Sequence, residues 1–455
     1  MRAVLPTLAY GLLGAALYVS RGHYHPVALV LVCVALAIVM VDLVAAWSGR
    51  VERLARHRSG WALGAVVAFG FFGLLTKMPG GYLPPGTALG WFRAGVVVAA
   101  LLALGYARSR LPVPRFYFGA LVALYLLLGV WIIRVDPAPA IDVWHFQQRA
   151  VELLLQGQNP YASFYPNIYG GTGLYGSGYL KDGRLYSFTY PPLVILWGLP
   201  GWLIGDVRYS LLAAVAGAAC FTVAMGRRLG LPPGHRAELA AVALLFHPRA
   251  FFLIDLAWVD PFLVLSSASL LWGLAGRRPA ERWVPLGLVF AAKQYGIFWL
   301  PSLLACRRLS RRETIRGLLL AAAIALPFFA WSPPDLWRGV VLIQVSNPFR
   351  ADALSALTVI ARWTGLELPS AIAFVAAAVV VGLAVRRAAP GREAIGGAAV
   401  FLAFFAFNKQ AFLNYYWLVG TFLLLAVVSE MARWPSDSLL PPAEEQRPIR
   451  RPADR

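Results

Sequence analysis

One polar stretch in this otherwise apolar chain carries residues that could do chemistry, and it opens at Asp142. From there, polar and apolar side chains alternate at helical spacing. One face carries Asp142, His145, Arg149, Glu152 and Gln156, and the other carries Val143, Phe146, Ala150, Leu153 and Leu154. The pattern predicts a short amphipathic helix lying on a membrane surface, apolar face down, with Asp142 at its N-cap and Gly157 at its end.

A tyrosine-rich loop follows this helix. Between Tyr161 and Tyr190 the chain has seven tyrosines and six glycines, and Asn159 and Pro160 lead into it. Residues 181–184 (Lys-Asp-Gly-Arg) predict a hairpin turn. Tyrosine joins a flat apolar ring to a hydroxyl, which suits sugars and lipid headgroups. The loop is therefore a candidate binding loop, and an aromatic belt at the membrane interface is the alternative.

Composition predicts a polytopic membrane protein. Hydrophobic residues make up 59% of the 455 and charged residues 14%, and the mean hydropathy is +0.65. The net charge of +20 comes from arginine clusters between apolar runs, which is typical of cytoplasmic loops and contacts with anionic lipid, and argues against nucleic acid as a partner. Cys33, Cys220 and Cys306 have no spacing that indicates a disulfide framework or a zinc site.

Apolar stretches of membrane-spanning length recur along the chain. The predicted spans are 3–20, 26–47, 60–76, 88–107, 116–134, 207–228, 237–254, 262–276, 313–332, 369–386, 394–407 and 411–430. The arginine clusters at 50–58 and 108–115 place the N-terminus in the cytoplasm and the polar stretch outside. The predicted fold is thus an all-α polytopic membrane protein with a large external loop that contains an amphipathic helix.

Two further apolar pieces affect the number of spans. Residues 190–204 and 283–304 contain internal prolines. If both cross the membrane there are fourteen spans, and the arginines at 227–236 and 277–282 lie outside. If both are re-entrant there are twelve, and every cluster of three or more arginines lies inside. We favour twelve, because broken helices are tolerated where they line a protein cavity, and Lys293 then lies at the tip of the second piece.

The chain divides into three predicted parts. Residues 1–110 form extra N-terminal membrane helices that carry none of the polar chemistry. Residues 111–432 form the main transmembrane module, with its external loop at 135–190. Residues 433–455 form a basic, proline-containing tail predicted to be disordered and cytoplasmic.

Several polar residues join the loop on the predicted external side. A lysine inside an apolar segment is costly, which makes Lys293 a candidate site residue. Asp255 and Asp260 could form an acceptor or metal site, or they could be solvated or salt-bridged. The other candidates are Gln294, Arg350, Lys409, Gln410 and Tyr415.

Over residues 116–430 the arrangement resembles the GT-C superfamily of membrane glycosyltransferases, and within it the bacterial mannosyl- and arabinosyltransferase-like branch. Three features carry the resemblance: Asp142 just outside a span at the start of an amphipathic helix, the sequence Leu-Leu-Gln-Gly-Gln-Asn-Pro-Tyr at 154–161, and Tyr-Pro-Pro-Leu at 190–193 where the loop re-enters the membrane. Members of this family take a sugar from a polyprenyl-phosphate donor.

The resemblance implies a catalytic base at Asp142, which would take a proton from a sugar hydroxyl of the acceptor. The lipid phosphate that leaves needs cations, and the candidates are Arg149, Lys293, Arg350 and Lys409. Transfer in one step would invert the anomeric configuration. The residues expected to bind substrate are His145, Arg149, Asn159, Tyr161, Tyr190, Lys293, Gln294, Arg350, Lys409, Gln410 and Tyr415.

The expected partners are a polyprenyl-phosphate sugar donor, a glycolipid or cell-envelope glycan acceptor, and membrane lipids, at the outer face of a bacterial cytoplasmic membrane. No cofactor is expected. The loop lacks the paired acidic residues of many relatives, because Asp136 precedes Asp142 by six positions, which weakens the case for a divalent metal and leaves it open.

Other interpretations remain for the residues and for the protein. Asp142 could be only a helix cap, Arg149 could pair with Glu152 on the helix surface, and His145 could be only solvated. At the level of the whole chain, a transporter or flippase for a glycolipid is the main alternative to an enzyme. A non-catalytic membrane scaffold is the third interpretation.

Overall fold

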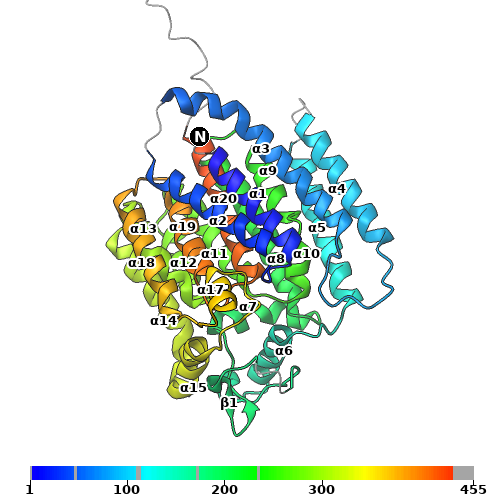
Figure 1. Cartoon of the computed structure of the whole chain (residues 1–455), viewed down its shortest axis with the longest axis vertical. Helices are drawn as coiled ribbons and strands as arrows, with labels where there is room; N and C mark the ends of the chain where they lie inside the picture. Colours follow the sequence, from blue (N-terminus) through cyan, green and yellow to red (C-terminus); the bar gives the residue numbers. More distant parts are fainter. Residues whose placement is uncertain (1–2, 46–48, 109–113, 171–173, 233–235, 434–455) are drawn as a thin grey trace, which may run out of the picture.

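The computed structural model describes residues 3–45, 49–108, 114–170, 174–232 and 236–433 (Figure 1). Within them the chain is helical apart from one two-stranded hairpin. The longer helices are α1 (Val4–Ser20), α2 (Pro26–Val44), α3 (Gly49–Thr76), α4 (Gly90–Arg108), α5 (Pro114–Val135), α6 (Asp142–Leu155), α7 (Pro192–Leu203), α8 (Arg208–Arg228), α9 (Arg236–Leu245), α11 (Asp260–Leu274), α12 (Ala280–Ala292), α14 (Arg311–Trp331), α17 (Ala356–Thr364), α18 (Ala371–Arg386), α19 (Glu393–Ala406) and α20 (Leu413–Ala432).

Short elements complete the described chain. They are α10 (Ala250–Asp255), α13 (Leu300–Ala305), α15 (Pro333–Trp337), α16 (Ile343–Ser346), the 3₁₀ helices η1 (Pro160–Ala162), η2 (Ser177–Tyr179) and η3 (Gln294–Trp299), the π-helical η4 (Arg338–Leu342), and the strands β1 (Leu180–Lys181) and β2 (Arg184–Leu185). Residues 333–346 are therefore a series of short helices.

The described chain is helical, and several of its helices have the length and composition of membrane spans. Among the described helices, five are long and apolar enough to cross a membrane, namely α2, residues 116–135 of α5, α8, α14 and α20. Each stretch predicted to span coincides with a helix, with one exception. The stretch 237–254 was expected to be continuous, and it is instead α9 and α10, interrupted at 246–249.

The arginine clusters predicted to lie on one side gather at one end of the bundle. Arg228 pairs with Glu281 at 2.7 Å, and Arg282 lies 3.5 Å from Glu313. Glu430, near the end of α20, lies 3.8 Å from Arg392. We call this the arginine end. The elements α6, β1 and α15 lie at the opposite end, which we call the loop end (Figure 1). The side chains of 50–58 and of 108–115 and the tail beyond 433 lie outside the described residues.

Of the two proline-containing pieces, 283–304 begins and ends at the same end of the bundle, whereas 190–204 contains one continuous helix, α7. Arg282, near the start of α12, donates to the Arg308 carbonyl at 3.4 Å, so both ends of 283–304 lie at the arginine end. The helix breaks at Lys293, which is extended (φ −158°, ψ 142°) and reaches the loop end. In 190–204, the Tyr190 carbonyl accepts from the Tyr161 hydroxyl at 2.6 Å, and α7 packs against α6 without a break at Pro200.

The four N-terminal helices are part of the bundle. The Tyr10 hydroxyl in α1 donates to the Ala243 carbonyl in α9 at 2.6 Å. The buried Arg249 guanidinium donates to the carbonyls of Leu17 and Tyr18 at the end of α1, at 3.3 and 3.0 Å. Since these partners lie more than 200 residues apart, the contacts fix α1 against the later helices.

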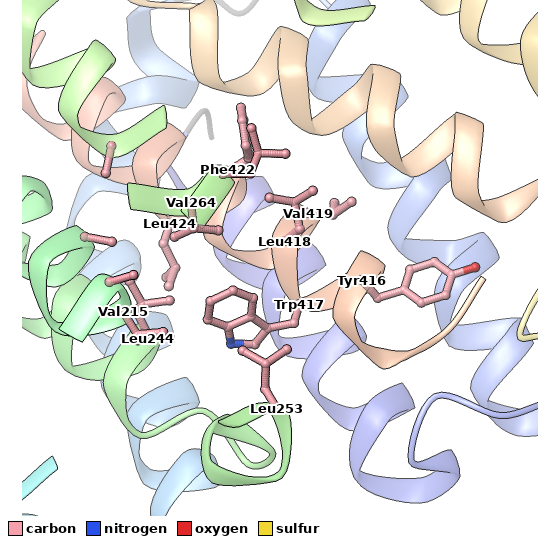
Figure 2. Close-up of a cluster of buried hydrophobic side chains, with 14 of the residues drawn as sticks. Val215, Leu244, Leu253, Val264, Tyr416, Trp417, Leu418, Val419, Phe422 and Leu424 are labelled. Atoms are coloured by element: carbon pink, nitrogen blue, oxygen red, sulfur yellow. The ribbon is translucent and has the colours of Figure 1, made fainter. Parts of the chain in front are cut away.

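Helix α20 lies at the centre of the apolar core (Figure 2). Its residues are buried along almost its whole length, which is expected of a helix that is apolar all round. Figure 2 shows Trp417 beside Leu253, with Val215 and Leu244 from neighbouring helices nearby. The loop end is therefore attached to a closely packed helical core.

Candidate functional site

The Asp142 carboxylate at the start of α6 is held by three donors. Its Oδ1 accepts hydrogen bonds from the Val143 amide at 2.8 Å and the Tyr169 hydroxyl at 3.4 Å, and its Oδ2 accepts one from the Tyr175 hydroxyl at 3.2 Å. Burial raises the pKa of Asp142, and these donors and the charge of Arg350 offset only part of the rise. A carboxyl with a raised pKa is a better proton acceptor than a solvated one.

The helix cap explains only part of this arrangement. Ile141 is the N-cap residue and Asp142 is the first helical residue, so the predicted cap position was wrong by one residue. The apolar face of α6 is buried as predicted, but it packs on protein: the Phe146 ring lies 4.7 Å from that of Tyr165. The expectation that this face lies on lipid was therefore wrong.

The tyrosine-rich loop extends from the carboxylate as a row of rings. The ring centroids of Tyr169 and Tyr175 are 5.9 Å apart, and those of Tyr175 and Tyr179 are 5.2 Å apart. The predicted hairpin is confirmed, and its turn residues Asp182 and Gly183 both have positive φ (52° and 72°), as a type I′ turn requires.

The loop is fixed by the segment α15–α16. The Tyr186 hydroxyl donates to Asp335 Oδ1 at 3.0 Å. Gly339 lies so close to the loop that a Cβ atom there would stand 2.1 Å from the Phe188 carbonyl oxygen. The backbones of the two segments thus interlock, and only glycine permits this approach.

Arg350 is the cation whose positive charge lowers the pKa of the Asp142 carboxyl. Its Nε and Nη2 both donate at 2.8 Å to the carboxylate of Asp352, and its guanidinium lies 4.9 Å from the Phe412 ring centroid. Although burial acts in the opposite direction, hydrogen bonds from His23 and Arg350 hold the pKa of Asp352 well below its ordinary value.

A second charged cluster surrounds Asp260 at the start of α11. Lys293 Nζ donates to both carboxylate oxygens at 2.9 Å, and Asn414 Nδ2 donates to Oδ2 at 2.7 Å. The Tyr295 hydroxyl also donates to this carboxylate. Lys293 is buried and charge-balanced by Asp260, so it adds a hydrogen-bonding group rather than an uncompensated positive charge.

Tyrosines lie between the two clusters. Burial raises the pKa of Tyr190, and the negative charges of Asp142 and Asp260 raise it further. The charges of both carboxylates therefore act on the Tyr190 side chain. The pKa of Tyr179 is raised by burial and then by the charge of Asp142.

Other predicted residues serve mainly as supports. Tyr161 is fully buried and its hydroxyl donates to the Tyr190 carbonyl at 2.6 Å, while Asn159 caps η1 by accepting from the Tyr161 amide at 2.9 Å. Gln294, Lys409 and Gln410 donate to backbone carbonyls of the segment 340–348, at 3.0, 3.0 and 3.1 Å. These side chains therefore support the backbone at Tyr190 and in the segment 340–348 through hydrogen bonds.

On the outer face of α6, the surface pairing considered for Arg149 is confirmed. Its Nη1 lies 2.8 Å from Glu152 Oε2, and both side chains are more than one third exposed. His145 packs edge-on against Trp144, with centroids 4.9 Å apart, and burial lowers its pKa. A neutral imidazole at this position can accept or donate a hydrogen bond.

An apolar cavity of about 250 Å³ opens beside the site. It begins at Pro191 and Gln294, which adjoin Tyr190 and Lys293, and it runs along α14. Its remaining lining is apolar: Pro192, Phe290, Ala291, Ala321, Ile324, Ala325, Phe329, Leu336, Trp337, Val340 and Val341. Only 17% of the apolar window of α14 is buried, so this helix faces the surroundings of the bundle.

Asp255 belongs to a buried network beneath the site. Arg208, fully buried, lies 2.7 Å from Asp206 and 3.5 Å from Asp255, and it donates to the Asp136 carbonyl at 2.6 Å. Burial and the neighbouring Asp255 carboxylate raise the pKa of Asp136 to about 6. Trp144 donates to Asp206 at 3.1 Å, which ties α6 to the network. Of the alternatives for Asp255, the salt bridge is the one observed.

Sequence reasoning did not single out the residues that touch Asp142. The density of tyrosines marked the loop, but nothing in their spacing indicated that Tyr169 and Tyr175 bind the carboxylate. His23 and Tyr82, from the N-terminal helices, also lie at this site, contrary to the expectation that residues 1–110 carry none of its chemistry.

Within the described residues, no group of three or more His, Cys, Asp or Glu side chains is placed to hold a metal ion. Comparison of the chain with protein-family models, with curated proteins and with solved structures gave no match.

Proposed function

We propose that this protein is a GT-C-type glycosyltransferase that moves a mannose- or arabinose-like sugar from a polyprenyl-phosphate donor to a glycolipid or cell-envelope glycan, at the outer face of a bacterial cytoplasmic membrane. One observation carries the proposal. A buried carboxylate with a raised pKa, Asp142, is held by loop tyrosines, and an apolar cavity opens at Pro191 and Gln294 nearby. Tyrosine rings with hydroxyls suit a sugar, and such a cavity suits a lipid chain.

In the proposed reaction Asp142 accepts the proton of an acceptor hydroxyl. That oxygen bonds to the anomeric carbon while the bond from this carbon to the phosphate oxygen breaks, and the lipid phosphate leaves with the electron pair. Attack from the opposite face inverts the configuration. Arg350 is the cation for the phosphate, because its positive charge already acts on Asp142. Lys293 is instead paired with Asp260.

The experiment that tests the function uses the full chain in liposomes. Polyprenyl-phosphate-linked mannose, arabinose and glucose are offered beside nucleotide sugars, and transfer into lipid and glycan acceptors is measured. We expect transfer from a polyprenyl-phosphate donor and none from nucleotide sugars. Movement of a glycolipid between leaflets without any transfer would contradict the proposal in favour of a flippase, for which a broken helix with an ion pair at its break is also suitable.

Filling the apolar cavity should weaken donor binding. Ala325 lines it, and Ala323 on the same helix is exposed and does not. We expect Ala325→Trp to raise the KM for a long-chain donor by roughly tenfold, which corresponds to about 1.4 kcal/mol of lost lipid contact. Ala323→Trp is the matched control. Equal KM values for both variants, measured by initial rates, would place the lipid elsewhere.

The pH profile should report Asp142. Because only the ionised carboxylate accepts a proton, the transfer rate falls as the pH drops through its raised pKa. The Tyr175 hydroxyl donates to this carboxylate and lowers its pKa, so Tyr175→Phe should move the acid limb to higher pH. Tyr186→Phe, which removes a hydroxyl bonded to Asp335, is the control and should leave the limb unmoved. An unshifted limb in Tyr175→Phe would assign it to another group.

A further inference from the structure

Two loops of the N-terminal helices reach the site. The α1–α2 connection carries His23, and the α3–α4 connection carries Tyr82. The proposed reaction gives roles to Asp142 and Arg350. Tyr82 lies beside Tyr169, which binds Asp142. His23 contacts Asp352, which binds Arg350. Both contacts join segments far apart in the sequence.

His23 acts on the partner of Arg350. Its Nδ1 lies 3.2 Å from Asp352 Oδ2, the oxygen that also accepts from Arg350 Nη2 at 2.8 Å. The neighbouring backbones pair as well: the Tyr24 amide donates to the Asp352 carbonyl at 2.8 Å, and His23 and Ala353 form an antiparallel bridge. The α1–α2 loop thus fixes the carboxylate that orients the Arg350 guanidinium.

Tyr82 acts on the partner of Asp142. Its side chain lies beside that of Tyr169, whose hydroxyl donates to Asp142 Oδ1. The loop is anchored from below, since Asp255 Oδ2 accepts from the amides of Gly81 and Tyr82 at 2.7 and 3.2 Å. The Tyr82 side chain is 39% exposed, so its role in the packed core is small.

We propose that the four N-terminal helices are a positioning part of this site, in which Tyr82 orients the Asp142 carboxylate through Tyr169 and His23 orients Arg350 through Asp352. The helices can do this because α1 is fixed to α9 by the Tyr10 hydrogen bond. The inference rests on the proposed function, and it gives residues 1–110 a role that their sequence did not suggest.

Removing the Tyr82 contact and removing the His23 contact should change different kinetic constants. Tyr82 acts through the base, which matters while the proton moves, so Tyr82→Phe should lower kcat by roughly 3- to 10-fold with little change in donor KM, as expected for the loss of one polar contact beside Tyr169. His23 acts through the cation that holds the donor phosphate in both the ground and transition states. We therefore expect His23→Ala to raise the donor KM by a similar factor.

Controls separate positioning from folding. Tyr18→Phe removes an α1 hydroxyl that lies 3.2 Å from the Thr76 hydroxyl and keeps the ring that packs against Phe69, Phe72 and Lys77, so it should match the wild type. His23→Asn places an amide donor near the position of Nδ1 and should restore the donor KM. Hydrogen exchange of residues 347–355 should rise in His23→Ala and return to the wild-type rate in His23→Asn.

The outcomes are distinct. A wild-type protein that transfers sugar, with Tyr82→Phe and His23→Ala showing unchanged kcat and KM, overturns the positioning role while the proposed function stands. Changed hydrogen exchange with unchanged kinetics overturns it also, because the contacts would then be only structural. Absence of transfer by the wild type overturns the proposed function and the positioning role with it.

Discussion

Asp142→Asn should reduce sugar transfer by about 10²- to 10⁴-fold, the usual contribution of a general base. The amide side chain keeps an oxygen for the Val143 amide but cannot accept a proton. The variant should still fold. The amide oxygen of asparagine can accept from the Val143 amide, and the Tyr169 and Tyr175 hydroxyls can rotate to suit the amide group. The measurement is the initial rate with a polyprenyl-phosphate donor, at equal protein content in the membrane.

The matched control is Asp182→Asn. Asp182 is exposed at the hairpin turn with φ of 52°, a conformation that asparagine adopts readily, so this variant should transfer sugar at the wild-type rate. If Asp142→Asn also transfers at that rate, the carboxylate only supports the tyrosines of the loop, and the base must be sought at Asp260.

Arg208→Met should have the largest effect on stability. Arg208 is the cation that Asp206 and Asp255 contact, and its removal leaves buried carboxylates without compensation. Breaking a buried ion pair in this way costs about 3–5 kcal/mol. We expect a large fall in the midpoint of thermal unfolding in detergent, measured by tryptophan fluorescence. Because Trp144 is tied to Asp206, α6 should lose order with it.

Arg149→Met is the comparison for this prediction. It removes the same side chain from a surface pair with Glu152 and should change the free energy of unfolding by only about 0–1 kcal/mol. If the two variants unfold at the same temperature, the Arg208 network contributes no more than a surface pair, and α6 is positioned by its apolar face alone.

The helices themselves could be predicted from the sequence. In a membrane each backbone group must bond within its own segment, so long apolar runs give helices irrespective of their neighbours. Local patterns were also sufficient for the buried face of α6, the end of that helix at Gly157 and the type I′ hairpin, because each depends on residues a few positions apart. The return of 283–304 followed from the arginines at its ends.

The partners of the site residues were decided only in the folded chain. Asp142 meets Tyr169 and Tyr175, Lys293 meets Asp260, and Arg350 meets an Asp352 that is shared with His23. The His23 and Asp352 side chains are 329 positions apart, and no periodicity relates them. Composition and spacing therefore determined that this chain is a helical membrane protein with one polar loop, whereas the packing of distant helices decided which charges are paired, because pairing depends on distance in space and not along the chain.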